Sequence, residues 1–196
     1  MRRRQVQELL MARSGEKGLY RVVEELPENP SSGLAGQAEV AVAAFASGVA
    51  VSANLNLGGF DRHGNHDQNH YRRLTELLAG IDHLWSQIEL HNFQDRTTVL
   101  VGSDFGRTPF YNNNRGKDHW NVTSIMATGA GVRGNRVVGA TDADIEALPV
   151  NPVTLQVDSG GVILTPEHVA LRRLAGISNQ FSSRFGIEEH FIDLFS

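Results

Sequence analysis

Apolar residues recur at three- and four-residue spacing along one stretch of the chain, between Tyr71 and Leu90. This spacing places them on one face of a helix, so the stretch is predicted to form an amphipathic helix. The residues on that face are Leu74, Leu77, Leu78, Ile81, Leu84, Trp85 and Ile88. An earlier helix is expected to begin at Gln37, because residues 24–36 carry prolines and glycines that interrupt any helical pattern.

Three shorter stretches have the pattern of β-strands. Residues 49–57 alternate apolar with small or polar residues and stop at Gly58-Gly59, as a strand followed by a turn does. Residues 97–101, TTVLV, form a continuous apolar run that is typical of a parallel strand buried on both faces. Residues 124–129 are expected to form a further short strand. The order strand, helix, strand predicts a βαβ unit, and therefore a parallel sheet with a right-handed crossover.

The chain is about as long as one domain, at 196 residues. Residues 5–12 are expected to form a short helix near the start, and residues 166–174 a late one. We therefore interpret residues 1–36 as a helix and connector, and residues 37–177 as the recognisable core of one partial domain spanning residues 1–196.

The composition narrows the range of partners and of metal ligands. A formal net charge of -4 is spread along the chain without a basic stripe, so nucleic acid is not an expected partner. The longest apolar stretch, residues 40–51, is shorter than the roughly 20 residues that span a bilayer, so no membrane span is expected. Cysteine is absent, so any metal ion must be held by histidine, carboxylate or water.

Polar clusters follow the two main predicted strands. Asp61 and His63 come after the first, and Ser103, Asp104 and Arg107 come after the second. Ligands of open parallel sheets bind beyond the carboxyl ends of the strands, so these two loops are expected to meet.

A third cluster, Asp118-His119, adds another carboxylate and another imidazole. These are the ligand types that bind Zn²⁺, Mn²⁺ and related ions. The alternative interpretation is that the aspartates form turns and the histidines are solvated. Arg107 is suited either to binding an anionic substrate or to holding a neighbouring carboxylate.

A rival pattern lies in HDQNH, where His66 and His70 have helical i, i+4 spacing and resemble the zinc-binding H-E-x-x-H pattern. Asp67 stands in place of the glutamate and is one methylene shorter. Gly64 and Asn65 indicate that the helix has only begun at this point. We therefore expect His66 or His70 to face solvent rather than to bind metal.

Three motifs in order, GGFDRH, SDFGRTP and GKDHW, resemble the signatures of the bacterial family called domain of unknown function 1501, in which GGWDTH, SEFGRTP and GRDHW recur. The resemblance covers about residues 40–177. The family is similar to a branch of the alkaline phosphatase and sulfatase superfamily, whose members hydrolyse phosphate or sulfate esters at metal ions. The implied fold is α/β, a three-layer αβα sandwich with a mostly parallel sheet whose N-terminal strands are missing from this sequence.

The same resemblance implies a set of metal ligands, namely Asp61, His63, Asp104 and His119, to which the Asp118-His119 cluster adds Asp118. Phe105 stands where the superfamily has a second-group His or Asn, which implies one divalent ion, zinc or manganese, rather than two. That ion would be held by Asp61, His63 and His119, and His66 could substitute for His63.

The implied activity is hydrolysis of a small anionic ester, with Arg107 orienting the anion and His119 acting as a ligand or general acid. The superfamily takes its nucleophile from an early strand that this sequence does not show. A water molecule made acidic by the ion, or a second polypeptide supplying the missing half, would then be needed. The alternative is a domain that binds a metal ion or anion without turnover. Family members are usually exported, whereas no apolar segment follows Met1-Arg2-Arg3-Arg4, so this chain by itself is expected in the cytoplasm.

Overall fold

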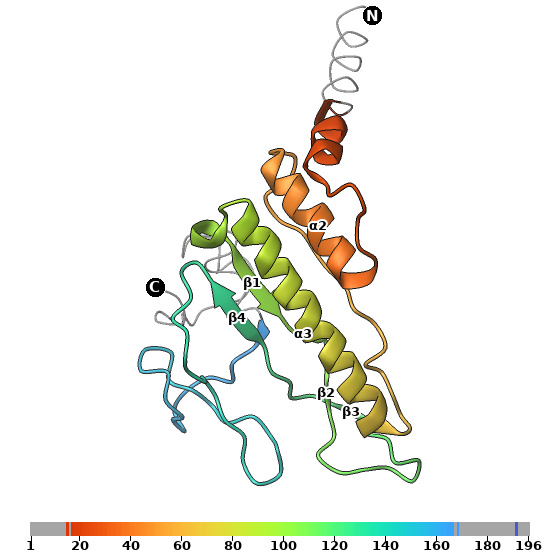
Figure 1. Ribbon diagram of the computed structural model, residues 1–196. Helices are drawn as coiled ribbons and strands as arrows, with labels where there is room; N and C mark the ends of the chain where they lie inside the picture. The colour runs from red at the N-terminus through yellow and green to blue at the C-terminus, as the bar shows by residue number, and fades with distance from the viewer. Residues whose placement is uncertain (1–14, 16, 167, 169–190, 192–196) are drawn as a thin grey trace, which may run out of the picture. The chain divides into compact units, whose positions relative to one another are not determined.

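The computed structural model describes residues 15, 17–166, 168 and 191. The chain divides into two compact units, Met1–Gln94 (unit 1) and Asp95–Ser196 (unit 2). Figure 1 shows helices in unit 1 and short strands joined by long loops in unit 2. The helix expected at residues 5–12 lies outside the described residues, as does the one at 166–174 apart from Pro166 and His168.

Unit 1 is held together by the packing of two helices, α2 (Gly33–Ala46) and α3 (His66–Leu90). The buried face of α2 is made of small residues, Ala38, Ala41, Val42 and Ala43. Gly80 of α3 lies against the side chain of Leu34, and a Cβ atom at this position would collide with it. Small side chains on both helices therefore allow a close approach. A further helix occupies residues 17–25.

The amphipathic helix predicted at residues 71–90 is confirmed, and it begins earlier, at His66. Ile88 is fully buried, but Leu74 and Leu78 are exposed. The difference follows from length, because α2 has 14 residues and α3 has 25, so α2 covers only part of the apolar face.

Among the described residues, no helix is both long and apolar enough to cross a bilayer.

The strand predicted at residues 49–57 is wrong, because this segment is extended but pairs with no other strand of the described residues. The backbone of Asn56 bonds the side chain of Gln37 instead. Gln37 Nε2 donates to Asn56 O at 2.9 Å, and Asn56 N donates to Gln37 Oε1 at 2.8 Å. A side-chain amide from α2 thus occupies the place that a neighbouring strand would take.

The strands of unit 2 form two separate antiparallel pairs. β1 (Thr98–Val101) pairs with β4 (Met126–Gly129), and β2 (Gly106–Arg107) pairs with β3 (His119–Trp120). The strands predicted at 97–101 and 124–129 therefore exist, but the parallel sheet does not form among the described residues. The expected three-layer αβα sandwich is wrong. β1 is half-buried along its whole length, which an antiparallel pair can provide without helices on both faces.

Outside these strands, the described residues of unit 2 are mostly irregular and surround a small core. Val150, Leu155 and Phe191 are buried together, with Val138, Val162 and Leu164 packed against them. Val150 also bridges two neighbours in antiparallel fashion, Val157 and Val162. This core fixes the loops that follow β4.

Candidate metal centre

In unit 1, Asp61 and His63 lie in the loop that leads into α3 and contact each other directly. His63 Nε2 is 3.1 Å from Asp61 Oδ1, and the two side chains are 49% and 60% exposed. Two ligands at about 2.0–2.1 Å from a tetrahedral ion are separated by roughly 3.3–3.4 Å, so this spacing fits one edge of a coordination shell. It fits a hydrogen bond equally well. The pair therefore has the residue types and the spacing of two ligands of one ion.

The loop is shaped by its own backbone and anchored by an aromatic ring. Gly59 has a φ of 92°, a region that favours glycine, and Arg62 N donates to Phe60 O at 2.9 Å just after it. The ring of Phe60 meets that of His70 edge-on, with centroids 5.6 Å apart. This ring contact attaches the loop to the first turns of α3. The polar side chains of the loop come directly after Phe60 in the sequence.

His66 and His70 have a different environment from the one expected. Their rings stack with centroids 4.5 Å apart, at an interplanar angle of 22°. His66 is buried and His70 is half-buried, so the expectation that they face solvent is wrong. The physical reason is that residues four apart on a helix lie one above the other, so the two rings can pack together, and that of His70 also meets Phe60. Both histidines therefore take part in the packing at the start of α3.

In unit 2, the motifs SDFGRTP and GKDHW pair with each other. Gly106 lies opposite Trp120 and Arg107 lies opposite His119 in the antiparallel register of β2 and β3. The pairing extends past the strands, because Thr108 N donates to Asp118 O at 3.0 Å and Asp118 N donates to Thr108 Oγ1 at 3.1 Å. We call this paired segment, residues 103–120, the ribbon.

The ribbon requires glycine at position 106. A Cβ atom there would collide with the backbone carbonyl oxygen of Val122. The glycine of SDFGRTP therefore permits a close backbone approach, and no side chain would fit in its place.

His119 is held by an aromatic residue that the sequence interpretation treated only as a missing ligand. The rings of His119 and Phe105 stack with centroids 3.8 Å apart, and the guanidinium carbon of Arg107 is 5.1 Å from the centre of the Phe105 ring. Phe105 thus orients the imidazole. The only sequence signal for this role is that Phe105 directly precedes a paired position and His119 is itself paired, which could be recognised only once the pairing was known.

The other predicted residues of unit 2 also lie on the ribbon. Arg107 Nη1 donates to Lys117 O at 2.9 Å, so the arginine contacts a backbone carbonyl of the ribbon, which neither of its two predicted roles included. Asp118 Oδ1 accepts a bond from Asn112 Nδ2 at 3.0 Å. Asp104 is exposed in the turn before β2. The structure therefore brings Asp61 to His63 in unit 1, and gathers Arg107, Asp118 and His119 on one ribbon in unit 2.

Comparison with known proteins gives one match. A family model described as "Protein of unknown function (DUF1501)" matches residues 15–157, which is well over half of the 196 residues. The matched stretch contains GGFDRH, SDFGRTP and GKDHW. No curated protein and no solved structure matches the chain.

Proposed function

The chain belongs to the DUF1501 family of proteins of unknown function, and on this basis we propose that it binds one divalent metal ion through Asp61, His63 and His119. The observation that carries the proposal is the 3.1 Å contact between Asp61 Oδ1 and His63 Nε2, which fits two ligands of a single ion. The three residues are exposed, and each offers one ligand atom. Asp104 and Asp118 are the further oxygen ligands that we propose from the ribbon.

The donor set favours zinc or manganese. One or more carboxylates with two imidazoles, and no thiolate, suit Zn²⁺ and Mn²⁺ better than the all-oxygen sites that Ca²⁺ and Mg²⁺ prefer. Metal-bound imidazoles are usually oriented by a hydrogen bond to a carboxylate, carbonyl or water. For His119, the contact that orients the ring in this structure is the stack with Phe105.

The finer proposal is hydrolysis of a small phosphate or sulfate ester. A bound ion would act as a Lewis acid on an ester oxygen. On the protein side, His119 is a ligand or a general acid. Arg107, whose Nη1 donates to Lys117 O, is the group that we propose to orient the anion.

Metal analysis of the purified full chain tests the binding proposal. We expect about one zinc or manganese ion per chain after reconstitution and dialysis, and a loss of most of it in Asp61→Ala, His63→Ala and His119→Ala. His91→Ala is the matched control, because His91 contacts Glu25 and is not a proposed ligand. Equal metal content in all four variants would contradict the proposal. Loss in the loop variants with retention in His119→Ala would restrict the site to unit 1.

Metal binding without turnover is the alternative, and one observation favours it. Asp61 and His63 are 60% and 49% exposed, whereas electrostatic catalysis works best in sites that exclude water. Assays with 4-nitrophenyl phosphate and 4-nitrophenyl sulfate separate the two functions. Metal-dependent release of nitrophenol that is lost in His63→Ala supports hydrolysis, while a metal-loaded chain without it supports binding alone.

A further inference from the structure

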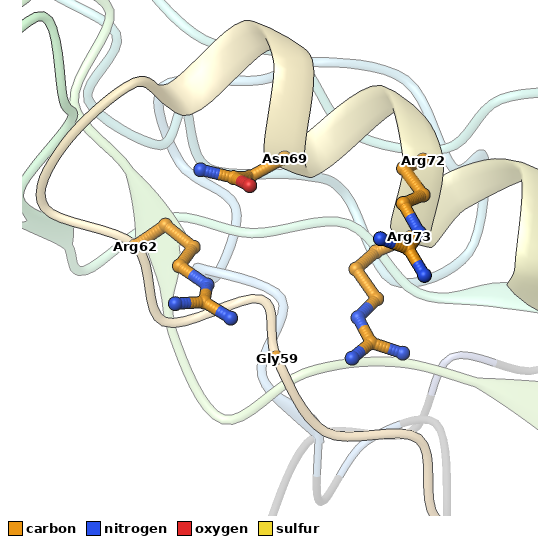
Figure 2. Close-up of a pocket in the computed structure, with 5 residues that line it drawn as sticks. All are labelled: Gly59, Arg62, Asn69, Arg72 and Arg73. Carbon is orange, nitrogen blue, oxygen red and sulfur yellow. The ribbon is translucent and has the colours of Figure 1, made fainter.

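A second polar site lies beside the Asp61–His63 loop in unit 1. Figure 2 shows a pocket lined by Gly59 and Arg62 from the loop and by Asn69, Arg72 and Arg73 from α3. Three of its five lining residues are arginines. None of the five is a proposed metal ligand, so this pocket stands independently of the metal proposal.

We propose that this pocket, the arginine pocket, binds a tetrahedral oxyanion such as phosphate or sulfate, free or carried on an ester. Guanidinium groups offer planar, forked donors that match the oxygens of such anions, and they stay protonated at any physiological pH. Asn69 adds an amide that can donate as well. The cavity volume of about 50 Å³ suits a small anion rather than a drug-sized ligand, whose pockets span roughly 300–1,000 Å³.

The local charges leave two of the three guanidinium groups for such a ligand. Arg73 Nη1 contacts Glu76 Oε2 at 2.6 Å, and Asp61 is engaged with His63. Within the described part of the chain, neither Arg62 nor Arg72 forms an ion pair with a carboxylate. Two like charges beside one pocket repel each other unless an anion lies between them, so an oxyanion would be stabilised here.

The backbone of Gly59 lets the loop approach Arg73 closely. A Cβ atom at Gly59 would lie 2.6 Å from Arg73 Nε and 3.1 Å from its guanidinium carbon. The glycine therefore allows the loop to lie close to the Arg73 side chain. Gly59 and Arg62 of the loop and Arg72 and Arg73 of α3 thus line the same pocket.

Titration of the full chain, treated with a chelator and kept at constant ionic strength, tests the proposal. Sodium sulfate and sodium phosphate probe the free oxyanion, and glycerol 3-phosphate probes the same group on an ester. We expect calorimetry to show at least one of them binding more tightly than chloride. The affinity should fall about tenfold or more in Arg62→Gln and in Arg72→Gln, since each loses a charge-assisted contact.

Arg21→Gln is the matched control, because Arg21 is an exposed arginine of unit 1 outside the pocket and its loss changes the net charge equally. His119→Ala should keep its oxyanion affinity even where its metal is lost, which separates this proposal from the metal site. Affinity no tighter than for chloride, or an equal loss in Arg21→Gln, would overturn it. Circular dichroism of each variant verifies that the fold is kept.

Discussion

The ribbon of unit 2 holds His119 by strand pairing and by a stacked ring, whereas Asp61 and His63 of unit 1 contact each other in a loop. His119 lies opposite Arg107 in the register and its ring is 3.8 Å from that of Phe105. Asp61 and His63 lie beyond the Phe60 anchor, in a segment without regular structure.

This difference indicates two ways to prepare a binding group. The ribbon fixes the imidazole before any ligand arrives, so little freedom is lost on binding. The loop brings its ligands close but leaves them exposed, so an ion would have to order them further. Each unit also carries its own tryptophan, Trp85 in α3 and Trp120 in β3, and the chain has only these two. Trp85→Phe and Trp120→Phe backgrounds therefore report the unfolding of each unit separately.

Gly106→Ala should have the largest effect, because it adds a Cβ atom against the carbonyl oxygen of Val122. Overpacking costs about 1–3 kcal/mol in side-chain cores, and a collision with backbone is expected at or above the upper end. Urea unfolding followed by Trp120 fluorescence should show this loss of stability. Gly134→Ala is the control, since no atom lies within 4 Å of a Cβ atom there. Equal stability of the two variants would contradict this prediction and show that the ribbon can shift to accept a side chain at position 106.

The pair of buried Glu39 and half-buried His83 predicts a pH dependence confined to unit 1. Burial acts to raise the pKa of Glu39, but hydrogen bonds from Ser31 and His83, and the charge of His83, outweigh it and lower the pKa. His83 Nε2 is 2.9 Å from Glu39 Oε1, and Ser31 N donates to Glu39 Oε2 at 2.8 Å. Since the folded pKa lies below the unfolded one, the stabilisation is complete above the ordinary value of 4.5 and is lost as pH falls through the folded pKa.

In the Trp120→Phe background, where Trp85 reports unfolding, the stability of unit 1 should therefore decrease as pH falls below 4.5. Glu39→Gln should cost about 1–3 kcal/mol at neutral pH and should flatten this dependence, because the charge and one of the two acceptor oxygens are lost. Unit 2, read by Trp120, should not respond to Glu39→Gln. An unchanged acid dependence in Glu39→Gln would assign the effect to other carboxylates.

The sequence predicts the elements of both units better than their arrangement. The spacing of Leu77, Ile81 and Ile88 identifies α3, because a helix is recognised from contacts along one face. The run at 97–101 identifies β1, but not its antiparallel partner at Met126–Gly129. Strand direction depends on which distant segment supplies the hydrogen bonds, and that information is not local. Residues 49–57 fail for the same reason, since Gln37 satisfies Asn56 there.

The candidate site follows the same rule. Asp61, His63 and His119 are found from their residue types and their place in three motifs. The roles of Phe105 and of the arginine pocket depend on contacts across the ribbon and between the loop and α3. Arg62, Arg72 and Arg73 are visible in the sequence as separate charges, but only folding places them around one pocket.

Phe105→Ala tests whether stacking orients His119. An aromatic pair contributes about 0.5–1.5 kcal/mol beyond its buried area, so a comparable loss of stability is expected in unit 2. If His119 binds metal, the affinity should fall by up to about tenfold, since 1.4 kcal/mol corresponds to a factor of ten. Phe105→Tyr is the control that keeps the ring. Equal metal affinity in Phe105→Ala and Phe105→Tyr would mean that the ribbon alone orients the imidazole.

Glu76→Gln should change stability least, and it tests the arginine pocket of unit 1. Glu76 and Arg73 form an i, i+3 pair whose side chains are 45% and 31% exposed, and such pairs contribute only about 0.2–0.5 kcal/mol. Removing the carboxylate leaves Arg73 beside Arg62 and Arg72, so sulfate affinity should rise while unfolding by urea hardly changes. Glu89→Gln, an exposed glutamate at the other end of α3, removes the same charge far along the helix. A rise in affinity shared by both variants would reflect net charge alone, whereas a rise in Glu76→Gln only would mean that Arg73 takes part once its own partner is gone.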